Sequence, residues 1–203
     1  MSEFTLSSIE PTREQAKHMV SMTYIDLVTA GHRMPFTYAN PENKKHIERQ
    51  YAKISDHPER YIGAYKGDRI TGFIKFNEWN MADQLPFESF YERAMHRLHL
   101  HRTGELPHHP IGIFALTAHP LESGGAVKAS EVRTELLRSV LEGNDDREIR
   151  ISHYEEDIAL KATTAAGFYG TGQSGRVAGI RQSLFVRPSL ADIVSQDFVS
   201  ESS

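Results

Sequence analysis

The 203-residue sequence contains no cysteine. This absence excludes disulfide scaffolds, thiolate nucleophiles and cysteine-ligated zinc sites, and it is typical of proteins from a reducing compartment. Long apolar runs are missing as well, because no stretch approaches the ~20 residues that a membrane-spanning helix needs. The amino terminus has neither the basic segment nor the apolar segment of a signal peptide. We therefore expect a soluble, cytoplasmic protein that does not act at membranes.

Positive charge is also scarce, since the 23 lysines and arginines are outnumbered by 27 aspartates and glutamates. A mildly acidic chain without a basic cluster lacks the electrostatic footprint of a nucleic-acid-binding protein, so we expect no nucleic-acid partner. The length suits one hydrophobic core, and no internal repeat or linker divides the chain. The sequence thus predicts one domain over residues 1–188, followed by a carboxy-terminal tail over 189–203.

The amino-terminal part of the sequence reads as a strand, two helices and a β-hairpin. These segments are a strand over 4–9, a helix that begins at Thr12, a helix that begins at Asn40, and strands over 61–65 and 69–79. Thr12 and Gln15 form a capping-box pattern at the start of the first helix. Asn40 has the character of an N-cap, because Pro41 follows it at the first helical position.

The carboxy-terminal part continues after a polar insert over 80–110, which we expect to contain a helix around 87–101. The sequence after this insert predicts a strand over 111–118 and a turn over 119–125. A helix with the apolar stripe Val132, Leu136, Leu137, Val140 and Leu141 follows, and then a strand over 147–152. Ser152 and Glu155 are expected to open a further helix that Gly167 closes, and the last two strands are expected over 168–173 and 179–186. This order indicates an α/β (α+β) fold, in which a mixed, central β-sheet has helices on both faces.

The order of elements over 4–186 resembles that of the GCN5-related N-acetyltransferase (GNAT) superfamily. Two segments carry the resemblance: a strand, His-Pro, glycine turn and Leu-Leu helix over 111–141, and a helix over 156–168 that ends in Gly167-Phe168. The resemblance implies an acyl-CoA N-acyltransferase-like fold and acetyl-CoA as the acetyl donor. It implies a primary amine of a small molecule or peptide as the acceptor.

A glycine-bearing turn that opens a helix suits a pyrophosphate, because free backbone N–H groups and the positive end of the helix dipole meet there. In this chain the turn is expected over 124–130, with Gly124, Gly125, Lys128 and Ser130 as cofactor-binding residues. The resemblance also implies that the preceding strand offers backbone groups to the pantetheine arm. By that resemblance the groups belong to Leu116, Thr117 and Ala118.

The sequence departs from the GNAT pattern at two places. The usual signature has Gln or Arg, then Gly, then Gly or Ala, where this chain has Lys128, Glu131 and Arg133. A carboxylate at Glu131 would repel a pyrophosphate, whereas a shifted Gly124-Gly125 loop would restore the backbone cradle. The second departure is Thr163, which replaces a tyrosine that many members use as a general acid; a threonine hydroxyl is too weakly acidic for that role.

Acyl transfer to an ammonium group needs a base and an oxyanion donor. Backbone N–H groups near Leu116 could supply the donor, and Glu78 or His119 could act as base. Tyr154 is the preferred substitute for the missing acid, and His153 precedes it at the predicted strand end. Each also has a purely structural interpretation: a solvated strand-end charge for Glu78, a turn residue for His119, and packing residues for His153 and Tyr154.

Histidines gather in the insert as His96, His99, His101, His108 and His109. They complete no recognisable metal motif, so we expect no metal and rank a metal hydrolase third among the functions. The insert is better explained as the wall of an acceptor pocket or as an oligomer contact. A catalytically silent domain that binds an acyl-CoA or a protein is the second alternative, since signature residues are missing. The tail over 188–198 could dock on a second subunit in a homodimer.

Overall fold

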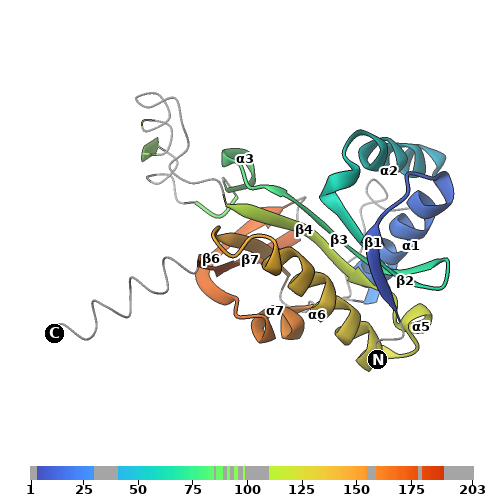
Figure 1. Cartoon of the computed structure of the whole chain (residues 1–203). Coiled ribbons are helices and arrows are strands. Elements are labelled where there is room, and N and C mark those ends of the chain that lie inside the picture. The colour runs from blue at the N-terminus through green and yellow to red at the C-terminus, as the bar shows by residue number, and fades with distance from the viewer. Residues whose placement is uncertain are drawn as a thin grey trace. The chain divides into compact units, whose positions relative to one another are not determined.

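The structure, a computed structural model, describes residues 4–29, 41–84, 86–88, 91, 94–95, 98, 110–154, 159–177 and 180–189. Seven strands form one sheet in the order β1-β2-β3-β4-β5-β7-β6 (Figure 1). The strands are β1 (Thr5–Ser8), β2 (Tyr61–Lys66), β3 (Arg69–Glu78), β4 (Ile111–Ala118), β5 (Ile149–His153), β6 (Tyr169–Val177) and β7 (Ile180–Arg187). The pairing of β4 with β5 is parallel and the pairs β1–β2, β2–β3, β5–β7 and β6–β7 are antiparallel, which confirms the predicted mixed sheet.

The helices among the described residues are α1 (Arg13–Thr29), α2 (Lys44–Asp56), η1 (Pro58–Arg60), α3 (Met81–Gln84), α5 (Pro120–Ser123), α6 (Ala126–Glu142) and α7 (Leu160–Ala165). Of these, α1, α2, α6 and α7 follow the predicted order, whereas η1, α3 and α5 were not predicted. Within these ranges, no helix combines the length and the apolar character that crossing a bilayer would require. The helix expected around 87–101 falls largely outside the described residues, as does the tail after Ser189.

The chain divides into two compact units. The first comprises Met1–Phe76, Phe114–Val140 and Glu156–Ala166, and the second comprises Asn77–Ile113, Leu141–Glu155 and Gly167–Ser203. Strands β3 and β4 therefore contribute residues to both units. The single domain over 1–188 stays a prediction.

Two helix starts illustrate how local capping decides the boundaries. The Gln15 N–H donates to Thr12 Oγ1 at 3.1 Å, which confirms the predicted cap of α1. Helix α2 begins at Lys44, where Asn43 Oδ1 accepts from the Lys45 N–H at 3.0 Å. The prediction that Asn40 starts this helix is therefore wrong, because an asparagine three residues later makes the cap.

Helices pack on both faces of the sheet in the first unit. Figure 1 shows α1 and α2 beside strands β1 to β3, and their buried side chains form one cluster with the strands: Ile9, Ala16, Met19, Met22, Ile54, Tyr61, Ile70 and Phe73. Neighbouring strand residues point to opposite faces. The missing side chain of Gly72 faces α6 instead, because a Cβ there would lie 2.8 Å from Val132 Cγ1. The predicted apolar stripe of α6 is buried, from Val132 to Leu141.

Trp79 anchors the hydrophobic cluster of the second unit. Its indole ring is buried, donates to Gln84 Oε1 at 3.0 Å and lies 6.2 Å from the ring of Phe87. Leu184 and Val186 of β7 complete the cluster. Trp79 therefore serves the core packing of this unit.

Of the two predicted boundaries of the helix before Gly167, the start at Ser152 is wrong and the end at Gly167 is confirmed. Ser152 lies inside β5, and its hydroxyl donates to Gln182 Oε1 at 2.5 Å, so the prediction that it opens the next helix is wrong. Pairing with β7 takes Ser152 into the strand. Gly167 has φ +86° and follows the C-cap residue Ala166 of α7, which confirms its predicted role as a helix terminator.

Alkaline pH is expected to destabilise the first unit through two tyrosines of β2. Burial raises the pKa of Tyr61 and of Tyr65, and the carboxylate of Glu10 raises the Tyr65 pKa further. The folded state therefore holds these protons more tightly than the unfolded state, whose tyrosines titrate near pH ~10. Their contribution to stability is complete below that pH and is lost as the pH rises through the folded-state pKa values.

Urea unfolding at about pH 8 and about pH 10.5 measures this effect, with the Tyr61→Phe/Tyr65→Phe variant as control. We expect the drop in unfolding free energy to be smaller in the variant, which lacks both ionisable hydroxyls. An equal drop in both proteins contradicts the assignment to these tyrosines.

Candidate active site

The carboxy-terminal end of β4 has one edge turned away from β3. The His119 N–H donates to Thr71 O at 2.9 Å, so the backbone groups of His119 point toward β3. Thr117 shares this direction, and a Cβ on Gly72 would lie 2.8 Å from Thr117 O. Backbone groups of successive strand residues alternate between the two sides. Leu116 and Ala118 therefore direct theirs away from β3, as a pantetheine-binding edge requires.

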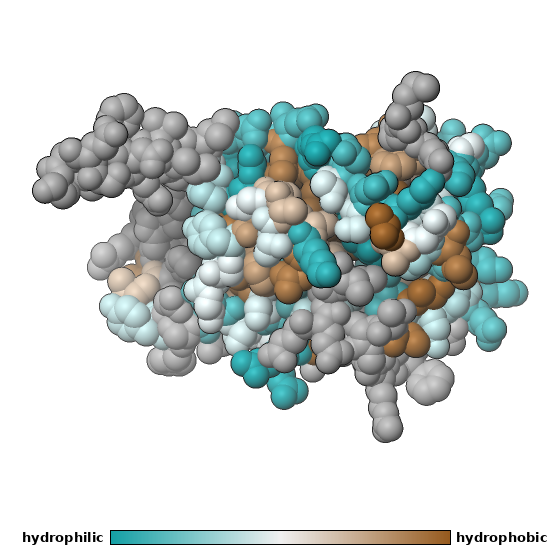
Figure 2. Space-filling model, turned by 90° about the horizontal axis from the view of Figure 1, so that it is seen from below, coloured by the Kyte–Doolittle hydropathy of each residue, from teal (hydrophilic) through white to brown (hydrophobic). Residues whose placement is uncertain are grey.

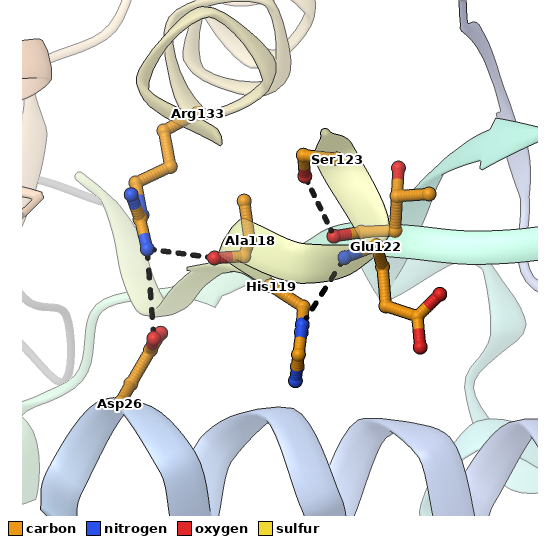
Figure 3. Close-up of polar contacts among 7 residues, drawn as sticks. Asp26, Ala118, His119, Glu122, Ser123 and Arg133 are labelled. Atoms are coloured by element: carbon orange, nitrogen blue, oxygen red, sulfur yellow. Dashed lines mark hydrogen bonds and ion pairs between the residues drawn. The ribbon is translucent and has the colours of Figure 1, made fainter. Parts of the chain in front are cut away.

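A short turn ties the end of β4 to the neighbouring strand (Figure 3). His119 caps α5, because its Nδ1 accepts from the Glu122 N–H at 3.3 Å, while the Ser123 hydroxyl donates to Thr71 O at 3.5 Å. The Glu122 carboxylate also pairs with Arg69 of β3 at 3.0 Å. An imidazole whose Nδ1 accepts carries its proton on Nε2. The structure thus supports the turn-residue reading of His119.

Two glycines then lead into α6. Gly124 and Gly125 have φ values of +90° and +123°, a conformation that favours glycine. The first helical hydrogen bond runs from the Ala129 N–H to Gly125 O at 3.0 Å, so the N–H groups of Ala126 and Val127 precede the helical ladder. The predicted turn over 124–130 is shorter in the structure, because α6 already begins at Ala126 and includes Lys128 and Ser130.

The mouth of α6, defined here as residues 124–127, is exposed throughout. The apolar side chains beside it are also exposed, with Leu121 at 85% and Val127 at 75%. Figure 2 shows hydrophobic side chains lying among hydrophilic ones on one face of the molecule. Lys128 is half-buried and Glu131 is exposed. Side chains therefore leave the helix mouth open, and the positive end of the helix dipole faces outward.

Arg133 turns inward instead. It is 3% exposed, and its Nη2 donates to Ala118 O at 2.8 Å and lies 3.5 Å from Asp26 Oδ1 (Figure 3). The sequence comparison with the GNAT signature gave no hint of this contact. A signal was present, however: Arg133 follows Ala129 by four residues and precedes Leu137 by four, which puts it on the buried face of α6.

The predicted catalytic residues Glu78, His153 and Tyr154 belong to the second unit, whereas the predicted cofactor-binding residues all belong to the first. His153 is 3% exposed and packs its ring edge-on against Phe185 at 5.6 Å. The exposed Glu78 carboxylate lies 3.6 Å from Arg147 Nη2. Tyr154 follows β5 directly and is half-buried. Their catalytic roles stay predictions.

Thr163 is fully buried in α7, and its hydroxyl donates to Ala159 O at 3.1 Å. This position corresponds to the tyrosine acid of the GNAT pattern. A buried hydroxyl that donates to its own helix backbone is poorly placed to protonate a leaving thiolate. Thr163 therefore does not replace the hydroxyl of that tyrosine.

The five histidines of the insert lie outside the described residues. Among the residues that the structure does describe, no three His, Asp or Glu side chains gather closely enough to hold a metal ion.

Comparison with known proteins finds similarity in structure alone. No protein-family model matches the sequence, and no curated protein matches it. A GNAT-family acetyltransferase from Streptococcus agalactiae superposes with a TM-score of 0.62 at 7% identity, over 92% of this chain and 95% of that one. An N-acetyltransferase from Staphylococcus aureus gives 0.59 at 13% identity, over 90% and 100% of the two chains. The yncA protein of Salmonella typhimurium, solved with its cofactor acetyl-CoA, gives 0.54 at 10% identity, over 91% and 93%.

These matches cover nearly the whole of each chain. Identities of this size establish the architecture and not the activity. The chain has the fold of the GNAT acetyltransferases.

Proposed function

We propose that this protein is an acetyl-CoA-dependent N-acetyltransferase that acts on a primary amine of a small molecule or peptide. The observation that carries the proposal is the open mouth of α6, which follows β4 after the short α5 turn, together with the edge of β4 that is turned away from β3. The shared fold and the acetyl-CoA bound to one structural neighbour support it.

The described residues suit a diphosphate at this place. A Cβ at Gly125 would meet no atom within 4 Å, so there is open space beside the turn. The N–H groups of Ala126 and Val127 and the helix dipole favour an anion. Lys128, in the first turn of α6, adds a positive charge. The backbone of Leu116 and the Ala118 N–H would pair with the pantetheine arm.

The reaction joins the amine nitrogen to the acetyl carbonyl carbon and breaks the carbon–sulfur bond. The ammonium form of the acceptor must first lose a proton, for which Glu78 is the proposed base, and the departing thiolate must gain one. We propose Tyr154 as that acid, with His153 fixed beside it in β5 by its packing on Phe185. A backbone N–H near Leu116 would stabilise the oxyanion.

Replacing Tyr154 with phenylalanine is expected to lower kcat about tenfold. The loss is smaller than is usual for general acids, because a thiolate leaves readily without help. Tyr169→Phe is the matched control, since Tyr169 is an exposed tyrosine of the same unit. Steady-state kinetics with acetyl-CoA measure the effect. Equal rates for both variants rule Tyr154 out as the acid.

A catalytically silent acyl-CoA-binding domain is the second candidate, favoured by the replaced signature residues and by the buried Thr163. Release of free thiol from acetyl-CoA over a panel of small and peptide amines separates the two. Turnover with at least one amine supports the transferase. Coenzyme A binding without thiol release over the whole panel supports the silent domain.

A further inference from the structure

We propose that Arg133 is a positioning residue that sets how far the cofactor arm pairs along β4. The inference rests on the proposed function, because it concerns the fit of coenzyme A to the same strand and helix. The GNAT signature has a small residue at this position, whereas this chain buries a guanidinium group there.

The guanidinium group of Arg133 donates a hydrogen bond to the last backbone carbonyl on the edge of β4 that is turned away from β3. Ala118 ends the strand, and its carbonyl points away from β3, toward the side where a cofactor arm would add. Because that carbonyl accepts from Arg133 Nη2 at 2.8 Å, it already has a protein donor. The next carbonyl with the same direction belongs to Leu116, about 7 Å back along the strand. The last β4 carbonyl that can pair with the pantetheine arm is therefore that of Leu116.

The same side chain links this edge to the proposed diphosphate seat. Arg133 emerges from α6 about 10 Å along the helix axis from Ala126, and it contacts the strand from there. Asp26 of α1 lies 3.5 Å from Nη2 and is itself only 8% exposed, so the guanidinium is held between α1, α6 and β4. The Arg133 side chain thus fixes the distance between the end of β4, where the pantetheine arm would pair, and the mouth of α6, where the diphosphate would bind.

Core stability alone is a poor explanation for an arginine at this position. Burying an ion pair costs desolvation energy, and apolar residues of similar volume often serve stability as well or better. Among the described residues, moreover, Arg133 Nε has no hydrogen-bond partner. Its Nη2 donates to Ala118 O at 2.8 Å and to Asp26 Oδ1 at 3.5 Å, and the shorter of these bonds, to the strand backbone, is one that an apolar residue cannot make.

Calorimetric titration with coenzyme A tests the inference on the full chain. Arg133→Met is expected to weaken binding about tenfold and to raise the KM for acetyl-CoA without raising the KM for the amine. Because this change removes the Arg133 charge from beside the buried Asp26 carboxylate, the decisive variant is Asp26→Asn/Arg133→Met. We expect the double variant to regain stability against urea and to keep the weak binding. Arg138→Met, at an exposed position of the same helix, should bind like the unaltered chain.

Recovery of full coenzyme A affinity in the double variant overturns the positioning role, since the effect then came from the stability of the fold. Unchanged affinity in both variants overturns it too, while the proposed function stands. If the unaltered chain itself binds no coenzyme A, the proposed function fails and this inference fails with it.

Discussion

Replacing Ala126 with aspartate lowers the affinity for coenzyme A about 100-fold, because a carboxylate then stands beside the diphosphate. A charge about 5 Å from the ligand, at an effective dielectric constant of about 20, costs about 3 kcal/mol of binding free energy. The same change is favourable for the helix, since an acidic side chain in the first turn suits the helix dipole. We therefore expect binding to fall while the unfolding free energy holds or rises.

Ala126→Asn is the matched control, because it has nearly the same shape and no charge. Its affinity is expected to stay within about threefold of that of the unaltered chain, and added salt should narrow the gap between the two variants. If Asp and Asn weaken binding equally, the charge has no role and the diphosphate does not bind at this helix mouth.

Replacing Gly72 with valine lowers the unfolding free energy by about 3 kcal/mol, because the side chain has no room. Its Cβ would lie 2.8 Å from Thr117 O and 2.8 Å from Val132 Cγ1, and 3.1 Å from the Cβ of Ala118. A backbone carbonyl cannot move aside as a flexible side chain can, so β4 or α6 must shift. Because the end of β4 and helix α6 both belong to the proposed coenzyme A site, the affinity for coenzyme A should fall whichever of them shifts.

Gly170→Val in β6 is the control for this substitution. Gly170 is exposed, and the nearest atom to its Cβ position is Phe185 Cε1 at an ordinary 3.5 Å. A β-branched residue suits a strand, so we expect this variant to be neutral or slightly stabilised. Urea denaturation of both variants measures the difference. If both variants lose the same unfolding free energy, Gly72 matters for strand formation and not for the close approach of α6.

The order of strands and helices could be predicted because hydrophobic periodicity is a local signal. Caps are local as well, yet they can be ambiguous: Asn40 and Asn43 lie three residues apart, and both match the N-cap preference. Ser152 and Glu155 also match a capping box. Pairing with β7 nevertheless makes Ser152 a strand residue, and the pattern within one segment contains no information about that pairing.

The candidate site was predictable where it consists of backbone. Glycines before an amphipathic helix mark an exposed turn, and the structure has that turn, although α6 begins at Ala126 and takes in the last five residues of the expected range 124–130. The inward course of Arg133 depends on Asp26, which lies 107 residues away in the sequence. A contact over such a separation leaves no local pattern, and only the position of Arg133 on the apolar stripe indicates it.

The central claim is that backbone N–H groups at the mouth of α6 bind the diphosphate of coenzyme A. Isothermal titration of the unaltered chain with coenzyme A tests it most directly. We expect saturable binding with one ligand per chain. Absence of any binding heat at millimolar ligand would contradict it.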